Sequence, residues 1–429
     1  MSLLSKFLEH PIVTTDSRNC PEGSIFFALK GENFNGNKFA AQALEKGCAY
    51  AVVDEKEYAV DDRYICVDDT LKALQLLAYE YRNTLNIPVI GITGTNGKTT
   101  TKELVSTVLS KKYNVLYTQG NLNNHIGVPL TLLRLRKEHE IAVIEMGANH
   151  PKEIEFLTGI ACPTCGIITN VGKAHLEGFG SFEKLVNTKC ELYDYLGAAN
   201  NTPTIFVNHD DDILLKRAMA FNATPKTYGV KSAQADIKGE IIDCDPFLRF
   251  KLFMNGSEYK VTTHLVGSYN IYNALAAATI GKEFNVNEED IVAALSDYVP
   301  SNNRSQFTET ANNKLVVDTY NANPTSMMAA LENFTLMSAP NKMAILGEMR
   351  ELGSISAEEH QRVADFLKSH GINDVWLVGA GFTDTVCNFR KFPNSTAVKA
   401  ELTANPIKGK CILIKGSNGN RLFELPELL

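Results

Sequence analysis

The sequence lacks any apolar run of about 18 residues or more, the length that a helix needs to cross a membrane, so we expect no membrane insertion. It also lacks an excess of basic charge, because 42 Lys and Arg residues stand against 49 Asp and Glu residues, a net charge of −7. Binding to nucleic acid through its phosphates requires a basic surface, so this balance argues against a nucleic-acid partner. The first residues lack the long apolar segment and the cleavage site of a secretory signal.

The cysteines offer neither a disulfide framework nor a metal site. There are nine, an odd number, and they are scattered along the chain. Cys162 and Cys165 form a CxxC pair, but no second such pair and no HxxxH pattern lies near it. We therefore interpret the two as structural residues at the start of a strand rather than as a zinc or redox site. This usage is typical of a reducing compartment and predicts a cytoplasmic protein.

What the chain does have is an alternation of strand-like and helical segments, which predicts an α/β protein. Its 429 residues allow two to four domains. Linker-like segments at 86–88 and 300–303 divide it into a small α/β N-terminal domain (1–85), a central P-loop ATPase-like domain (86–299) and a C-terminal Rossmann-like domain (300–429). In the central domain we expect a mostly parallel sheet with helices on both faces. Residues 236–265 alternate in polarity like an antiparallel insertion.

The most informative segment is a phosphate-binding loop. Residues 89–93 form an apolar strand that leads into Gly94 and Gly97, and a helix is expected from Lys98 onward. The glycines permit a tight turn, and its N–H groups at the helix N-terminus can hold anionic oxygens. Lys98 would reach the outer phosphates of a nucleotide, and the Thr99 hydroxyl would ligate Mg²⁺. The spacing is shorter than in the general pattern, because an isoleucine occupies the place of its first glycine.

This loop, Thr-Gly-Thr-Asn-Gly-Lys-Thr-Thr at residues 93–100, resembles the nucleotide loop of the ATP-dependent Mur ligases. A similar loop occurs in folylpolyglutamate synthetases. Three further stretches resemble the branch of the Mur ligases that adds D-alanyl-D-alanine: residues 15–31, 121–130 and 318–327. The matching segments run through essentially the whole chain in the expected order. The resemblance implies an N-terminal domain for a UDP substrate, an ATPase domain and a C-terminal Rossmann-like domain.

The activity that this resemblance implies is that of an ATP-dependent amide ligase in peptidoglycan precursor synthesis. The substrates would be UDP-N-acetylmuramoyl-tripeptide and D-alanyl-D-alanine, and the cofactors ATP and Mg²⁺. ATP would phosphorylate a peptide carboxylate to an acyl phosphate, which the amine then attacks, leaving ADP and phosphate. Such a transfer depends on positioning and on charge neutralisation. We expect a monomer whose domains close around ATP.

Four residues are expected to form the catalytic set. Glu145 ends an apolar strand near the phosphate loop, where its carboxylate is well placed to hold Mg²⁺ together with Thr99. The resemblance implies that His175 is a ligand of a second metal ion. It also implies that Lys189 is carbamylated, which would turn its ammonium into a carboxylate-like metal ligand. Lys98 completes the catalytic set.

Further nucleotide contacts follow from the resemblance. Asn273 would contact the nucleotide, Arg304 the phosphates and Asp318 the ribose, although an asparagine replaces the glycine that usually precedes the arginine. Together with the loop, the expected ATP-binding set is Gly94, Thr95, Asn96, Gly97, Lys98, Thr99, Thr100, Asn273, Arg304 and Asp318.

Substrate contacts are expected in all three domains. Ser17 and Arg18 would contact the UDP portion, where a guanidinium can form paired hydrogen bonds to phosphate. Asn124 and His125 lie where the family approaches the muramoyl peptide. The last group would hold either nucleotide or dipeptide, and the sequence leaves that choice open; it consists of Tyr320, Asn321 and Asn323.

Two segments keep alternative interpretations. Asn35 and Asn37 replace an aspartate and a histidine of the family's Gly-x-x-x-Asp-Gly-His pattern, so recognition of uridine can differ in detail. The glycine-rich segment 415–419 is either a further anion-binding loop or an ordinary turn.

Two other functions compete with this hypothesis. One is another member of the superfamily, an earlier Mur ligase or a folylpolyglutamate synthetase. The Asp-Thr-Tyr-Asn-Ala-Asn-Pro run at 318–324 argues against both, and no Asp-Asn-Pro-Arg motif of the diaminopimelate-adding ligase is present. The other is a nucleotide-dependent switch. A switch needs one Mg²⁺ site, so Glu145, His175 and Lys189 together favour the ligase.

Overall fold

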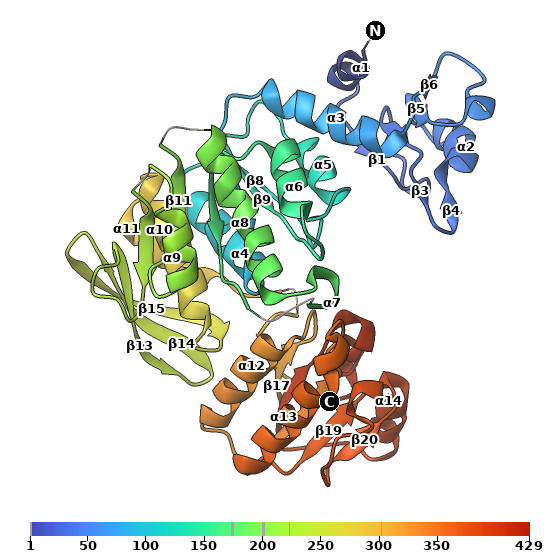
Figure 1. Cartoon of the computed structure of the whole chain (residues 1–429). Helices are drawn as coiled ribbons and strands as arrows, with labels where there is room; N and C mark the ends of the chain where they lie inside the picture. The colour runs from blue at the N-terminus through green and yellow to red at the C-terminus, as the bar shows by residue number, and fades with distance from the viewer. Residues whose placement is uncertain (1, 173–175, 200–201, 223, 302) are drawn as a thin grey trace.

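The computed structural model describes residues 2–172, 176–199, 202–222, 224–301 and 303–429. It contains three main sheets, which follow one another along the chain (Figure 1). This confirms the predicted α/β class with a small N-terminal domain, a central parallel-sheet domain and a C-terminal sheet domain; the individual boundaries stay predictions. Among the described residues, no helix is both long enough and apolar enough to span a bilayer.

The N-terminal domain is built on a four-stranded parallel sheet in the order β1-β2-β5-β6. A short hairpin of β3 and β4 follows β2. The strands are β1 (Val13–Thr14), β2 (Ile25–Phe27), β3 (Lys30–Gly31), β4 (Phe34–Asn35), β5 (Tyr50–Val53) and β6 (Tyr64–Cys66), and the helices are α1 (Leu3–Glu9) and α2 (Ala40–Glu45).

Helix α3 (Thr70–Asn83) joins this domain to the centre of the molecule (Figure 1). The Asp69 side chain caps it by accepting a hydrogen bond from the Lys72 N–H. Its last turn is fixed to the central domain, because the Tyr81 hydroxyl donates to the Leu135 carbonyl at 2.9 Å and Arg82 donates to backbone carbonyls that include Ala161. The helix therefore belongs to both domains.

A nine-stranded sheet in the order β15-β14-β13-β12-β11-β10-β7-β9-β8 forms the central domain. The strands from β8 to β13 are parallel, and β13, β14 and β15 are antiparallel. The expected antiparallel insertion is thus an extension of the same sheet, because β13 pairs in parallel with β12. The strands are β7 (Val89–Thr93), β8 (Val115–Tyr117), β9 (Ile141–Glu145), β10 (Cys165–Ile168), β11 (Thr204–Asn208), β12 (Lys226–Gly229), β13 (Ile237–Cys244), β14 (Phe247–Met254) and β15 (Ser257–Val266).

Helices cover both faces of this sheet, as the sequence predicts. One apolar core lies under α4 (Lys98–Leu109), α10 (Asn270–Glu283) and α11 (Glu288–Asp297). A second core lies on the other face, under α5 (Gly127–Leu132), α6 (Glu153–Ala161) and α8 (Phe182–Ala199). Two shorter helices, α7 (Leu176–Phe179) and α9 (Asp212–Ala218), complete the domain. The free Cys165 is buried at the start of β10 and Cys162 lies three residues before it, in line with a structural role.

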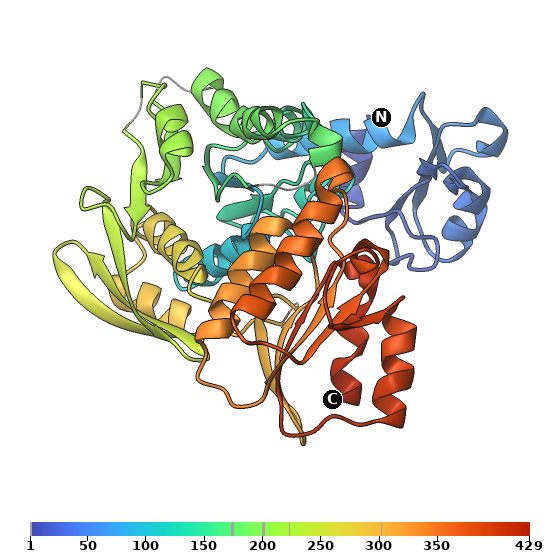
Figure 2. The same ribbon diagram turned by 60° about the horizontal axis from the view of Figure 1, so that its bottom comes forward.

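The C-terminal domain has a six-stranded sheet in the order β16-β17-β21-β18-β19-β20, in which only the β16–β17 pairing is antiparallel. Helices α12 and α13 cover one face and α14 the other, and Figure 2 shows this domain from the side of α12 and α13. The elements are β16 (Gln306–Glu309), β17 (Lys314–Asp318), α12 (Pro324–Leu336), β18 (Lys342–Gly347), α13 (Ser356–Ser369), β19 (Val375–Val378), β20 (Arg390–Phe392), α14 (Ser395–Ala404) and β21 (Cys411–Lys415).

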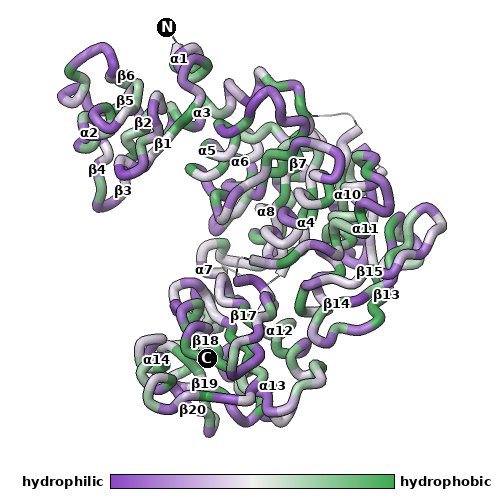
Figure 3. Tube along the Cα trace, turned by 180° about the vertical axis from the view of Figure 1, so that it is seen from behind, coloured by the Kyte–Doolittle hydropathy of each residue, from purple (hydrophilic) through white to green (hydrophobic). Residues whose placement is uncertain are grey.

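Each of the three domains has a buried apolar centre. Hydrophobic residues concentrate in the inner strands, such as β18 and β19, while hydrophilic residues follow the loops (Figure 3). Because the strands of all three sheets are mostly parallel, their carboxyl ends collect at common edges, where ligands bind in α/β proteins.

His360 in α13 is a fully buried polar residue of the C-terminal core. Its Nε2 accepts a hydrogen bond from the Met349 N–H at 3.0 Å, and its Nδ1 lies 2.7 Å from the Ser356 carbonyl. This arrangement requires a neutral ring, with the proton on Nδ1. Burial lowers the pKa of His360 below its usual value of 6.5.

We predict that His360→Gln makes the stability of this domain less sensitive to acid. The unfolded chain takes up a proton near pH 6.5 and the folded chain does so at a lower pH, so the free energy of unfolding of the wild type falls as the pH drops below about 6.5. The variant lacks this contribution. Urea unfolding at pH 7 and pH 5, followed by the fluorescence of the chain's one tryptophan, Trp376 in β19, measures the difference. Equal pH dependence in both proteins would contradict the prediction.

Candidate functional site

The phosphate loop connects β7 to α4 through two glycines at which any side chain would be strained. Gly94 has φ of +139° and Gly97 has φ of +76°, in the region that favours glycine. A Cβ on Gly94 would lie 2.1 Å from the Thr169 Oγ1, and one on Gly97 would lie 2.5 Å from the Asn273 Oδ1. The backbone therefore lies tightly against its neighbours, and α4 begins at Lys98 as predicted.

Asn170, directly after β10, holds this loop in place. Its Oδ1 accepts a hydrogen bond from the Asn96 N–H at 3.0 Å, and its Nδ2 donates to the Asn96 carbonyl at 2.9 Å. The Asn170 carbonyl accepts from the Thr95 N–H at 2.9 Å. The expected site residues did not include Asn170. Its position after the strand that neighbours β7 is the signal that could have found it.

Glu145 ends β9, whose register places it beside Ile92 of β7. Its side chain is 1% exposed. Oε1 accepts hydrogen bonds from the Thr99 hydroxyl at 3.2 Å and from the Asn123 amide at 2.7 Å. Oε2 is buried and has no hydrogen-bond partner among the described residues. A buried carboxylate oxygen without a partner is costly, and a hard cation such as Mg²⁺ is the natural partner for it. Thr99 and Glu145 thus fit the expected metal.

Two desolvated lysines belong to this part of the central domain. The Lys98 Nζ donates to the carbonyls of Gly94 and Thr95 at 2.8 and 2.9 Å. Lys98 is partly exposed, but desolvation lowers the pKa of its ammonium to about 8, and the nearby Glu145 partly opposes this shift. Lys189 in α8 is 2% exposed, and its Nζ donates to the Ala148 carbonyl at 3.2 Å. Burial, followed by repulsion from Lys98, holds the pKa of Lys189 well below its usual value. A neutral amine of this kind is the form that can capture CO₂.

A cavity of about 960 Å³ lies at the junction of the central and C-terminal domains, over the phosphate loop. It brings together most of the predicted nucleotide, metal and peptide residues. Those that line it are Thr95, Asn96, Gly97, Lys98, Thr99, Thr100, Asn124, His125, Glu145, Asn273, Arg304, Asp318, Tyr320 and Asn321. Lys189 does not line the cavity, but its ammonium is hydrogen-bonded to the carbonyl of the lining residue Ala148. His175 falls outside the described residues.

Comparisons with known proteins agree with this geometry. Three family models match in chain order: the catalytic domain of the Mur ligase family at 10–82, the Mur ligase middle domain at 92–281 and the glutamate ligase domain of Mur ligases at 303–418. The UDP-N-acetylmuramoyl-tripeptide–D-alanyl-D-alanine ligase of Bacillus subtilis is 35% identical over 426 residues, which cover 96% of this chain and 92% of the relative. The chain belongs to the Mur ligase family.

Two solved structures resemble this Mur ligase along nearly its whole length. A crystal structure of MurF from Acinetobacter baumannii is 31% identical with a TM-score of 0.84, and the match covers 97% of this chain and 92% of that one. The MurF ligase from Thermotoga maritima in complex with ADP is 26% identical with a TM-score of 0.86, and the match covers 100% and 98%. Both support the three-domain architecture.

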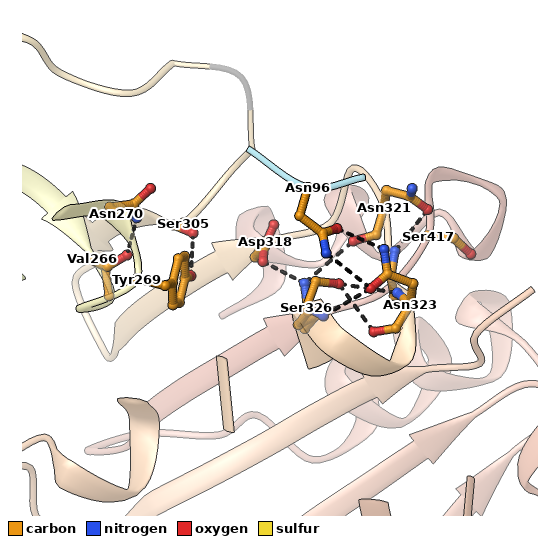
Figure 4. Close-up of polar contacts among 12 residues, drawn as sticks. Asn96, Val266, Tyr269, Asn270, Ser305, Asp318, Asn321, Asn323, Ser326 and Ser417 are labelled. Carbon is orange, nitrogen blue, oxygen red and sulfur yellow. Dashed lines mark hydrogen bonds and ion pairs between the residues drawn. The ribbon is translucent and has the colours of Figure 1, made fainter. Parts of the chain in front are cut away.

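The C-terminal domain of this Mur ligase presents its polar residues from the ends of β17 and β21 and from the loop before β16 (Figure 4). The Arg304 guanidinium lies over the Tyr320 ring, 3.8 Å from its centroid, and the Arg304 Nε is buried without a hydrogen-bond partner among the described residues. Asp318 is paired with the Lys415 Nζ at 2.5 Å. The expected site residues did not include Lys415, although segment 415–419 was a candidate. Lys415 ends β21, the strand next to β17, and this position at the carboxyl edge of the sheet could have identified it as a site residue.

A second cavity of about 300 Å³ lies beside the first and shares Tyr320 and Asn321 with it. Asn323 lines this second cavity, as do Arg350 and the Gly-rich turn at Ser417. The turn after β21 therefore forms one wall of this cavity. The buried Lys415 ammonium at the start of the turn is already paired with Asp318.

The predicted UDP contacts lie apart from both cavities. Ser17 and Arg18 follow β1 in the N-terminal domain, and the exposed Arg18 side chain forms a paired contact with Asp16 at 2.9 Å. Asn37 has a structural role. Its Nδ2 donates a hydrogen bond to the Asp54 Oδ1 at 2.8 Å, and its Oδ1 accepts one from the Asp54 N–H at 3.0 Å. Its fully buried amide therefore anchors the turn after the β3–β4 hairpin to the end of β5.

We predict that Glu145→Gln lowers ATP turnover by about 100-fold or more, because the neutral amide offers the cation a much weaker ligand. Phosphate release from ATP, measured as Mg²⁺ is titrated, is the assay. Asn123→Ala serves as the matched control, since it removes one hydrogen bond to the same carboxylate but leaves the charge, and we expect a decrease of about 10-fold or less. Turnover of Glu145→Gln within threefold of the wild type at saturating Mg²⁺ would refute the metal site.

Proposed function

We propose that this Mur ligase joins D-alanyl-D-alanine to UDP-N-acetylmuramoyl-tripeptide and so forms the UDP-N-acetylmuramoyl-pentapeptide precursor of peptidoglycan. ATP is converted to ADP and phosphate, and one C–N bond is formed. The proposal rests on one observation above all: a phosphate loop, the unpartnered carboxylate oxygen of Glu145 and the desolvated Lys189 meet beside a cavity between two domains. Relatives that carry this activity in their names align with nearly the whole chain.

The first step is the transfer of the γ-phosphoryl group of ATP to the terminal carboxylate of the tripeptide. Both groups are anionic, so the site must neutralise charge and align the reacting oxygens. The loop N–H groups, Lys98 and Arg304 are the donors that face this part of the cavity. The amine of the dipeptide then attacks the acyl carbon, phosphate leaves with the C–O bonding electrons, and the amine loses a proton.

Mg²⁺ would lie between Thr99 and Glu145 and would neutralise charge on the phosphates. We propose that Lys189 serves a second metal ion as its carbamate, because the amine is buried, weakly basic and close to Lys98. This second site distinguishes a ligase from a nucleotide-dependent switch. His175 stays a predicted ligand.

The remaining substrates would occupy the surfaces around the ATP cavity. We assign the dipeptide to the smaller cavity beside Asn321, whose volume suits a small zwitterion and whose Arg350 can pair with a carboxylate. Asn124 and His125 would face the muramoyl peptide, and Ser17 and Arg18 the UDP end. A cytoplasmic location and a monomeric state are kept as predictions.

The product assay tests the proposal directly. We expect ATP, the tripeptide nucleotide and D-alanyl-D-alanine to yield, by mass spectrometry, a product equal to the two substrates less one water, with one ADP formed for each product. Tripeptides that end in lysine and in diaminopimelate should both be supplied, and L-alanyl-L-alanine is the control amine. If neither tripeptide gives dipeptide-stimulated phosphate release, the proposal is wrong.

Lys189→Ala should reduce product formation to about 1% of the wild type or less, because it removes a metal ligand from a desolvated site. A short carboxylic acid such as acetate should restore part of the activity by supplying the missing oxygens. Lys184→Ala, an exposed position on the same helix, is the matched control and should act like the wild type. Near-normal turnover of Lys189→Ala without acetate would exclude Lys189 from metal binding.

A further inference from the structure

The phosphate loop is bonded directly to the C-terminal domain through two asparagine side chains (Figure 4). The Asn323 Nδ2 donates a hydrogen bond to the Asn96 Oδ1 at 2.7 Å, and the Asn96 Nδ2 reaches the Asn323 Oδ1 at 3.5 Å. Asn96 lies in the loop between β7 and α4, and Asn323 immediately precedes α12. The contact therefore links the ATP-binding loop to a different domain.

Each asparagine is fixed by hydrogen bonds within its own domain. The Asn323 Oδ1 accepts from the Ser326 N–H at 2.9 Å, and the Ser326 Oγ accepts from the Asn323 N–H at 3.1 Å, so Asn323 is the cap of α12. Asn323 is 5% exposed. The backbone of Asn96 is fixed by Asn170 on both its N–H and its carbonyl. A bond between two fixed elements restricts how the domains can move.

A second close approach lies next to this pair. A Cβ on Gly172 would lie 3.1 Å from the Thr325 Oγ1, so the start of α12 rests against the loop that follows β10. The Gly172 N–H in turn donates to the Thr95 Oγ1 at 3.0 Å. The first turn of α12 thus sits on a platform made of two loops of the central domain, and one of these is the phosphate loop.

We propose that Asn323, through Asn96, is a positioning residue that sets the C-terminal domain on the phosphate loop. The segment that it fixes begins at Asp318 and carries Tyr320, whose ring packs against the Arg304 guanidinium. Asn323 thereby places Arg304 at the ATP phosphates without touching the nucleotide itself. This role rests on the proposed function, and it assigns the Asn96 and Asn323 side chains to each other rather than to a ligand.

The pair suits this role because both side chains are neutral amides. An amide pair adds no charge beside the phosphates. One such hydrogen bond shifts the equilibrium between open and closed domain arrangements by about 3- to 10-fold. A contact of that strength stabilises a closed arrangement and still allows it to open in each cycle.

Asn323→Ser separates positioning from helix capping, since serine is a good cap but cannot reach Asn96. Ser326→Ala is the matched control, because it removes half of the capping box and leaves the amide pair intact. Asn96→Ala removes the pair from the other side while every backbone bond of the loop remains. The double variant Asn96→Ala with Asn323→Ser closes a mutant cycle.

We expect Asn323→Ser and Asn96→Ala each to lower kcat by about 3- to 10-fold, and Asn323→Ser to leave ATP affinity within about twofold of the wild type. The double variant should be no slower than either single one, and Ser326→Ala should keep its kcat. X-ray scattering with a non-hydrolysable ATP analogue should show less compaction for the Asn323 and Asn96 variants than for Ser326→Ala.

The proposal is overturned if Asn323→Ser matches Ser326→Ala in kcat and compaction, or if the two single losses multiply in the double variant. Asn96→Ala keeps the test valid should Asn323→Ser fail to fold. Absence of dipeptide-dependent product in the wild type would remove the proposed function alone, because the analogue-induced compaction still reports on the asparagine pair.

Discussion

Three ionisable groups, on Lys98, Glu145 and Lys189, are withdrawn from water around one loop, and the architecture of the two larger domains serves to keep them there. Burying a charge without a partner costs several kcal/mol, so an apolar core would not tolerate this arrangement. Strand β9 positions Glu145, and helices α4 and α8 position Lys98 and Lys189. The neutral amides of Asn170 and Asn123 fix the loop and the carboxylate through hydrogen bonds. We propose that a divalent cation and the phosphates of ATP supply the partner that the Glu145 Oε2 lacks among the described residues.

The two sheets that flank the ATP cavity contribute in complementary ways. The central sheet supplies backbone N–H groups and the carboxylate from the ends of β7 and β9, while the C-terminal sheet supplies Asp318 and Lys415 from the ends of β17 and β21. Because Asp318 and Lys415 already neutralise each other, Arg304 is the uncompensated cation that the C-terminal domain brings to the cavity among its described lining residues. The placement of the C-terminal domain on the phosphate loop therefore determines where the positive charge of Arg304 lies.

Local patterns in the sequence were enough to predict much of this arrangement. The strand at 89–93 has the expected bounds, because its apolar run ends there at a glycine-rich turn. The meeting of Thr99 and Glu145 follows from the common edge of parallel strands. The contact between Asn96 and Asn323 could not be predicted, because 227 residues separate them and only the packing of two domains brings them together. The same holds for the parallel pairing of β12 with β13, which joins the antiparallel strands to the central sheet.

Helix α3 has a mechanical consequence for the opposite end of the molecule. Its last turn is bonded to backbone carbonyls of the central domain, while its first turn is capped beside the N-terminal sheet. A stiff rod of 14 residues, roughly 20 Å long, thus joins the two domains, and the Gln75 amide in its middle also donates a hydrogen bond to the His125 carbonyl of the central domain. The N-terminal sheet is therefore held against the central domain along several turns of this helix, and the two domains share one apolar core. The separation between the N-terminal sheet and the phosphate loop is accordingly set by a rigid helix rather than by a flexible tether.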